Sequence, residues 1–132
     1  MNKYIESYDP NCDQDQEAWG LIDDDERIYL VSEYHRKARI KLPNLKAHAL
    51  FHVIVENQVA MGNKIPVCRI LARLLAEGLD RHDAIHAIGS VLSKFIFNHA
   101  QGIRIADVDP NLAYWTDLEN ISAESWHNSD SN

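Results

Sequence analysis

Apolar residues recur every three or four positions from about residue 23 onward, a spacing that predicts amphipathic helices. The first predicted helix covers residues 23–39, and its apolar stripe steps by three, four and three. This stripe consists of Ile28, Val31, His35 and Ala38. Pro43 follows, and we expect the helix to end before it because proline does not continue a helix.

The next two predicted helices carry their own start and stop signals. Asn44 can cap a helix over residues 45–61, because its side chain can accept from the free N–H groups of the first turn. Gly62 is a natural stop for this helix, since glycine readily adopts the left-handed backbone found at helix ends. A third helix is predicted from Pro66, which suits a first helical position, to Gly78.

A fourth helix is predicted from an Asp80 cap to about Asn98. The segment 103–110 then alternates weakly between apolar and polar residues, and Pro110 can start one more short helix. Residues 121–132 are mostly polar, so we expect them to form a frayed tail.

The pattern contains no pair of strands with a hairpin turn, so we predict an all-α fold. We expect a single-domain helical bundle of about four main helices, with short extra helices at the ends. Composition divides the chain into an acidic N-terminal lead-in (1–20), the helical bundle domain (21–120) and a polar C-terminal tail (121–132). At 132 residues the chain is long enough to bury a core without disulfides.

The charge and the cysteines narrow the possible partners and location. A formal net charge of -7 argues against a nucleic-acid binder, which needs a concentrated basic surface. The sequence has no apolar run of about eighteen residues and no export signal at its start, so we expect no membrane partner. Cys12 and Cys68 form no CxxC pair, which fits a reducing compartment. We therefore expect a soluble cytoplasmic protein.

Four histidines form two HxxxH pairs, one on the second predicted helix and one on the fourth. Residues 48–52 read HALFH and residues 82–86 read HDAIH, which pairs His48 with His52 and His82 with His86. Residues four apart lie on one face of a helix, so each pair can direct two imidazoles toward one point. Short loops would leave these two helices roughly parallel, with the pairs at overlapping heights. We therefore expect the four imidazoles to converge.

Imidazoles that converge inside a helical bundle are typical metal ligands. Glu56 continues the first stripe as HxxxHxxxE and could add a carboxylate, although it lies about one turn beyond His52. Nitrogen and carboxylate ligands without a thiolate suit zinc, iron, manganese, nickel or copper. We predict a divalent metal site made of His48, His52, His82, His86 and Glu56.

Other interpretations of these histidines stay open. Neither pair is HExxH, so the usual metalloprotease helix with its glutamate base is absent. His82 and Asp83 form the dipeptide of HD-type phosphohydrolases, but no clear partner aspartate follows on the same helix. The histidines could also form a metal-free polar cluster bonded to Glu56 or to backbone groups. His35, on the inner stripe of the first helix, is interpreted as a histidine at the core edge.

The two pairs belong to a longer pattern in residues 48–98, with a glutamine, a proline and an Arg-Leu pair between them. The residues that carry it are His48, His52, Gln58, Pro66, Arg73, Leu74, His82, Ala84 and His86. This pattern resembles a family of small bacterial proteins classed as a domain of unknown function. The resemblance implies a helical domain with paired histidines as its signature, and it implies no activity. Some of those proteins have an acid where this chain has Ile85, so no carboxylate ligand is implied there.

Two functions of different classes fit these observations. The first is metal binding, in which an ion with a free coordination position could activate water for hydrolysis. The second is a non-enzymatic module that binds a protein through the acidic N-terminal segment or the Trp115 region, with the histidines as a structural cluster. The sequence indicates neither a substrate nor catalytic residues. A chelator distinguishes the two functions, because only a bound metal stabilises the folded state by mass action.

Overall fold

The computed structural model describes residues 5–42, 44–100 and 110–130. The described chain forms seven α-helices and one short 3₁₀ helix. They are α1 (Gln16–Leu21), α2 (Asp24–Lys37), α3 (Leu45–Ala60), η1 (Gly62–Lys64), α4 (Val67–Ala76), α5 (Arg81–Ala100), α6 (Pro110–Asn120) and α7 (Ala123–Asp130). These ranges contain no strand, so the predicted all-α fold is confirmed.

The predicted start and stop signals lie at the ends of the helices. The side chains of Asn44 and Asp80 each accept a hydrogen bond from the backbone N–H three residues on, at 3.0 and 2.8 Å. Such bonds satisfy donors that every helix start leaves free. Gly62 and Gly78, which follow α3 and α4, have φ angles of 59° and 108°, where glycine is strongly favoured. Pro43 and the weakly alternating residues 103–109 lie outside the described residues.

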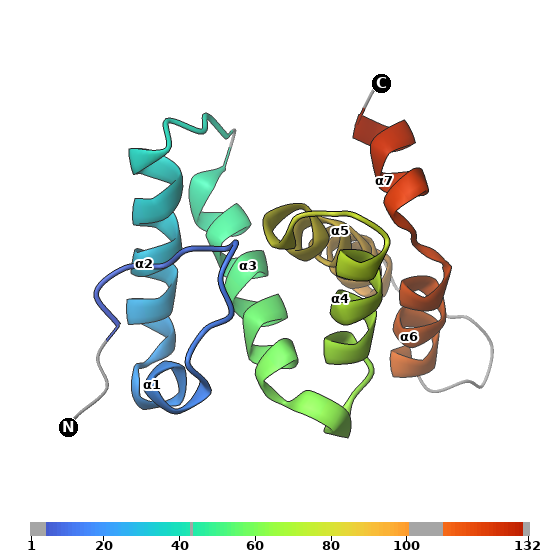
Figure 1. Ribbon diagram of the computed structural model, residues 1–132, viewed down its shortest axis with the longest axis horizontal. Helices are drawn as coiled ribbons and strands as arrows, with labels where there is room; N and C mark the ends of the chain where they lie inside the picture. Colours follow the sequence, from blue (N-terminus) through green and yellow to red (C-terminus); the bar gives the residue numbers. More distant parts are fainter. Residues whose placement is uncertain (1–4, 43, 101–109, 131–132) are drawn as a thin grey trace.

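The central helix of the molecule is α3. Figure 1 shows α2 and α3 side by side in opposite directions, with α4 on the other side of α3. In the same view we look almost along the axis of α5, whereas the axis of α3 lies close to the plane of the picture. The two helices therefore cross each other. The expected parallel arrangement of these two helices is therefore wrong. The turn at Gly78 sends α5 across the layer, where it contacts α3, α4 and α6.

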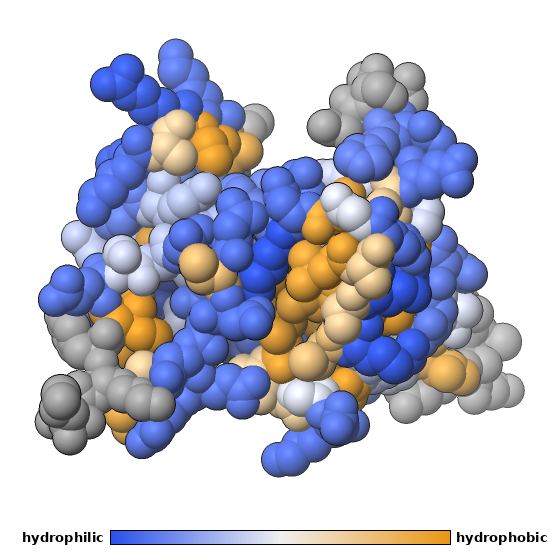
Figure 2. All heavy atoms as spheres, in the orientation of Figure 1, coloured by the Kyte–Doolittle hydropathy of each residue, from blue (hydrophilic) through white to orange (hydrophobic). Residues whose placement is uncertain are grey.

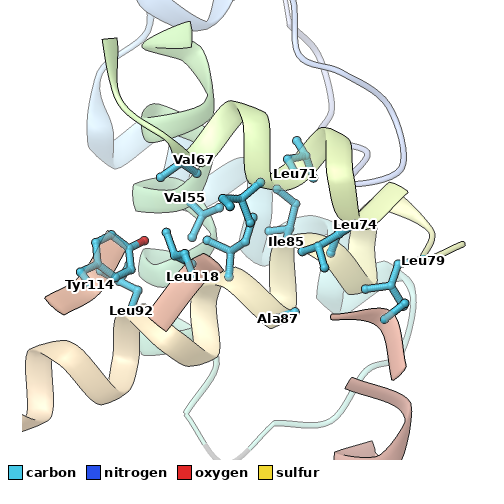
Figure 3. Packing of buried hydrophobic residues seen from close by; sticks show 14 residues of the cluster. Val55, Val67, Leu71, Leu74, Leu79, Ile85, Ala87, Leu92, Tyr114 and Leu118 are labelled. Carbon is cyan, nitrogen blue, oxygen red and sulfur yellow. The ribbon is translucent and has the colours of Figure 1, made fainter. Parts of the chain in front are cut away.

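Two hydrophobic clusters share α3. The larger cluster joins α3, α4, α5 and α6, and Figure 3 shows Val55, Leu74, Ile85 and Leu118 gathered within it. The smaller cluster joins the N-terminal segment, α1, α2 and α3, and includes Tyr8, Trp19, Val31 and Val53. These apolar contacts hold α2 and α5 against α3. The histidines lie where these three helices meet.

The predicted polar tail instead contains helix α7. Its start is capped reciprocally, because the Ser122 hydroxyl accepts from the Ser125 N–H at 3.0 Å and the Ser125 hydroxyl accepts from the Ser122 N–H at 2.9 Å. Ala123 is buried, and Trp126 packs against the larger hydrophobic cluster. The cap and these two contacts order a segment whose overall polarity suggested fraying.

An apolar band lies on the face of the molecule that Figure 2 shows. Figure 2 shows apolar atoms gathered over α4, and Leu75 of this helix is 38% exposed. A cavity of about 260 Å³ between α3 and α4 lies among Val59, Leu71 and Leu75. No helix in the described ranges is long and apolar enough to cross a membrane. Cys12 and Cys68 are both free thiols, and the cytoplasmic location stays a prediction.

Candidate metal centre

Three of the predicted histidines meet where α5 crosses α3. The Nε2 atom of His86 on α5 lies 2.8 Å from Nε2 of His52 and 3.1 Å from Nε2 of His48. His48 and His52 are one turn apart on α3, and their ring centroids are 4.8 Å apart. The crossing therefore brings both histidines of the α3 pair to the second histidine of the α5 pair.

His35 of α2 completes a group of four imidazoles. It is fully buried, and its ring centroid lies 4.7 Å from that of His48 and 4.8 Å from that of His52. One ligand atom from each member of the group lies within 4.8 Å of all the others; the members are His35, His48, His52 and His86. Ligands about 2.0–2.1 Å from a tetrahedral zinc ion lie roughly 3.4 Å apart. Four donors at this spacing could hold a metal ion.

His82, the first histidine of the α5 pair, lies beside this group and not within it. Its ring centroid is 4.2 Å from that of His86 and 5.3 Å from that of His52. The Nε2 atom of His82 is buried and has no hydrogen-bond partner among the described residues. His82 is therefore a fifth imidazole at the edge of the cluster.

The ring nitrogens outnumber the hydrogen bonds that they can make with one another. Each nitrogen of a neutral imidazole carries either one proton or one lone pair. Nε2 of His86 faces two other Nε2 atoms, so it can form a proper hydrogen bond with only one of them. Nε2 of His35, like that of His82, is buried without a partner in the described chain. A cation would accept lone pairs from several of these nitrogens at once.

Two of the rings are held in the tautomer that a metal needs. Nδ1 of His35 lies 2.8 Å from the Val31 carbonyl oxygen, which only accepts, so Nδ1 carries the proton. Tyr8 donates its hydroxyl proton to Glu56 at 2.6 Å, and its oxygen lies 3.1 Å from Nδ1 of His52. This oxygen therefore accepts from the His52 Nδ1–H. In both rings Nε2 keeps its lone pair, as in metal sites where the second nitrogen is bonded to an acceptor.

Glu56 is connected to the imidazole group through Tyr8, whose hydroxyl contacts both Glu56 and His52. Its Oε1 accepts from Arg81 Nη2 at 2.7 Å, while its Oε2 accepts from Arg81 Nη1 at 2.8 Å and from Tyr8. The Glu56 and Arg81 side chains are only 1% and 5% exposed. Both carboxylate oxygens are thus engaged within the protein, and Glu56 reaches the histidines through Tyr8.

Arg81 also fixes the N-terminal segment over the start of α5. Its Nη1 donates to the Pro10 carbonyl at 3.0 Å, and its Nε donates to Asp13 at 3.0 Å. The side chain of Asn11 accepts from the backbone N–H of His82 at 3.0 Å. Residues 8–13, part of the predicted loose lead-in, therefore cover this end of the cluster and supply Tyr8.

The surroundings keep the imidazoles neutral. Burial, together with the neighbouring histidines, lowers the pKa of His48 to about 4 and that of His86 to about 3. The same causes hold the pKa of His52 far below its ordinary value, and burial lowers the pKa values of His35 and His82. Burial and the charge of Glu56 raise the pKa of Tyr8, which keeps its proton. The lone pairs are therefore available to a metal near neutral pH.

One side of the cluster faces a cavity of about 370 Å³. His48, His52 and His86 line it, and the fully buried His35 does not. The remaining wall comes from α3, α5 and α7, with Phe51 and Trp126 as its aromatic members. A small molecule in this cavity would reach three of the four grouped imidazoles.

The chain matches no family model, no curated protein and no solved structure. The interpretation of the histidine cluster therefore depends on the geometry of its own side chains. That geometry describes a helical protein with four imidazoles close enough together to hold a metal ion.

Proposed function

We propose that this protein binds a divalent metal ion through His35, His48, His52 and His86. The observation that supports this proposal is the position of the His86 Nε2 atom, which lies 2.8 Å from Nε2 of His52 and 3.1 Å from Nε2 of His48. These three nitrogens cannot all be paired by hydrogen bonds to one another. His35, whose buried Nε2 has no hydrogen-bond partner among the described residues, belongs to the same group. A bound cation gives each of these nitrogens a partner.

The donor set narrows the choice of metal. Imidazole suits zinc, copper, nickel and iron, whereas manganese prefers oxygen ligands. We propose that Glu56 orients His52 through Tyr8 and does not ligate the ion, because Arg81 and Tyr8 use both of its oxygens. His82 is available as a further ligand, since its buried Nε2 adjoins the group.

The proposed ion would face the cavity on the side of His48 and His86. An ion held there by His48, His52 and His86 together with His35 would supply Lewis-acid chemistry that activates water, so metal-dependent hydrolysis is one chemistry that this position would support. The same arrangement also suits reversible binding of a small ligand. The family resemblance of residues 48–98 adds the paired histidines as a signature and leaves the reaction undefined.

Elemental analysis of the full chain, purified without a histidine tag, tests the proposal. We expect close to one equivalent of zinc, nickel, copper or iron per chain, lost in His52→Ala and in His86→Ala. His127→Ala is the matched control, because His127 is exposed on α7 and lies outside the cluster. Circular dichroism establishes that each variant is folded. If the folded wild-type chain took up none of these metals after anaerobic loading, the proposal would be wrong.

Chelation provides a second, independent readout. An ion that binds only the folded state at about 100 times its Kd adds about 2.7 kcal/mol to the free energy of unfolding. For a chain of this size that is on the order of 10 °C in melting temperature. We therefore expect a chelator to lower the melting temperature of the wild-type protein but not that of His52→Ala. An equal response of the two proteins would contradict the metal site.

The alternative, a module that binds another protein, has less support. In the N-terminal acidic segment, Asp13 pairs with Arg81 and Asp15 caps α1 by accepting from the Ala18 N–H at 2.9 Å. Trp115 packs against the larger hydrophobic cluster. Both regions suggested by the sequence thus make contacts within the fold.

A further inference from the structure

The cavity next to the histidine cluster determines where the proposed metal ion would meet another molecule. This inference rests on the proposed metal site. Three of the four ligands, His48, His52 and His86, line the cavity, while His35 is buried on the side away from it. An ion held by these four side chains would therefore have its remaining coordination position toward the cavity. Four histidines close a tetrahedral zinc site, so this position exists for an ion that takes five or more ligands, as nickel(II) and copper(II) do.

The wall of this cavity is apolar next to the ligands. Phe51 of α3, Ile85 of α5 and Trp126 of α7 all contribute to it. The ring centroid of Trp126 lies 6.5 Å from that of His86, so an aromatic surface adjoins the coordination position. The volume of about 370 Å³ lies in the range of small-molecule sites, about 300–1,000 Å³. These features suit a ligand with a compact apolar body.

The charges of the proposed ion and of the cavity-lining residues indicate which donor group such a ligand would carry. Apart from the three histidines, no titratable side chain occurs among the cavity-lining residues of the described chain. Neutral imidazoles leave the charge of a divalent ion uncompensated, so an anionic donor would be attracted to it. The hydroxyls of Ser90 and Ser93, which also line the cavity, can donate to an oxygen of a monoanion.

Gly89 leaves room for this ligand. It lies within α5 and lines the cavity, and a Cβ atom built on it would meet nothing within 4 Å. Glycine destabilises a helix interior relative to alanine, and close packing does not require it here. A larger side chain at position 89 would enter the cavity and would leave the imidazoles in place.

We infer that the cavity admits a small organic monocarboxylate with an aromatic or branched apolar body, whose carboxylate oxygen coordinates the histidine-bound metal. The apolar body lies against Phe51 and Trp126, and the second carboxylate oxygen accepts from a serine hydroxyl of α5. Binding of this kind replaces a metal-bound water and involves no change in oxidation state.

Benzoate binding to the cobalt-loaded full chain tests the inference. Cobalt(II) reports its ligands through its visible absorption bands, so metal binding and benzoate binding are observed separately. We expect one equivalent of cobalt to give a spectrum that shifts saturably with benzoate. Benzamide, which has the same shape without the charge, should leave the spectrum unchanged.

The Gly89→Leu variant supplies the decisive comparison. It should keep the cobalt spectrum and weaken benzoate binding roughly tenfold or more, because leucine fills the space of the apolar body. Lys94→Leu, at an exposed position of α5 outside the cavity lining, should bind cobalt and benzoate like wild type. The inference is overturned if benzoate leaves the spectrum of the cobalt-loaded protein unchanged, if benzamide shifts it equally, or if Gly89→Leu binds benzoate like wild type. Absence of any cobalt spectrum would instead overturn the metal site itself.

Discussion

Tyr8 connects a buried carboxylate to one imidazole of the cluster, so its hydroxyl should influence metal affinity without touching the metal. In Tyr8→Phe, Nδ1 of His52 loses its acceptor, and Glu56 keeps only its bonds to Arg81. Loss of such a partner typically weakens metal binding by about 10–100-fold. We expect this change in the Kd for zinc, measured by competition with a chromophoric chelator.

Tyr29→Phe is the control for this substitution, because Tyr29 is 58% exposed and belongs to α2 outside the cluster. Its Kd for zinc should equal that of the wild-type chain. If Tyr8→Phe bound zinc with unchanged affinity while remaining folded, Tyr8 would only pack against the cluster and would not orient His52.

The lowered histidine pKa values predict how the metal-free protein responds to acid. The pKa is about 4 for His48 and about 3 for His86, against an ordinary 6.5. Below pH 6.5 these two histidines therefore bind protons in the unfolded chain but stay neutral in the folded chain. The free energy of unfolding should fall as the pH drops from about 6.5 to 4, by up to about 1.4 kcal/mol per pH unit for one histidine.

Urea unfolding at several pH values between 7.5 and 4 measures this slope. His86→Leu removes one of the responsible groups and should make the slope shallower. A metal-free protein whose stability did not change between pH 6.5 and 5 would show that the buried imidazoles take up protons as easily as free ones.

Among the helices, the stability of α7 should depend on the cap that Ser122 and Ser125 form at its start. Replacing Ser122 with alanine removes the hydroxyl that accepts from the Ser125 N–H, and loss of such a cap costs about 1 kcal/mol. We expect Ser122→Ala to speed hydrogen exchange of the α7 amides while α3 and α5 keep their protection. Lys94→Ala, at an exposed position within α5 outside the cavity, should leave exchange in α7 unchanged. Equal α7 exchange rates in Ser122→Ala and wild type would contradict this account.

The main helices could be predicted because their signals are local. Asn44, Asp80 and Gly62 lie at element ends, and the apolar spacing between them marks each helix. The HxxxH pairs were visible for the same reason, since residues four apart share one face. The Ser122 cap is also local, but the prediction of a frayed tail rested only on the polarity of residues 121–132.

The rest of the site depends on contacts between distant parts of the chain. His35 has no histidine four residues away, and it joins the cluster only because α2 packs on α3. Tyr8 belongs to a segment without periodicity, and Arg81 holds this segment in place from far along the chain. The crossing of α5 over α3 likewise results from tertiary packing. No local pattern contains these relationships.

For the molecule as a whole, the buried pair of Glu56 and Arg81 joins α3, α5 and the N-terminal segment. Arg81→Met leaves the Glu56 charge buried without its partner, and breaking a buried pair in this way costs about 3–5 kcal/mol. We expect a large loss of stability in urea unfolding. Adding Glu56→Gln should recover part of it, because the uncompensated charge is then gone.

The control for Arg81→Met is Arg69→Met, which breaks the exposed ion pair of Arg69 with Glu119. Exposed pairs contribute little because water solvates both charges, so this variant should unfold close to wild type. Should Arg81→Met prove as stable as Arg69→Met, the buried pair would not be what joins these three parts of the fold.

Because the ring of His35 is fully buried, bound metal should decide whether wild type or His35→Leu is the more stable protein. Its Nε2 has no partner in the described chain, and a buried polar atom in that state costs roughly 1–3 kcal/mol. Without metal, His35→Leu should therefore unfold at higher denaturant concentration than wild type. With zinc the order should reverse, because the leucine variant has lost a ligand. Such a crossover would identify position 35 as a place where this protein gives up intrinsic stability for function.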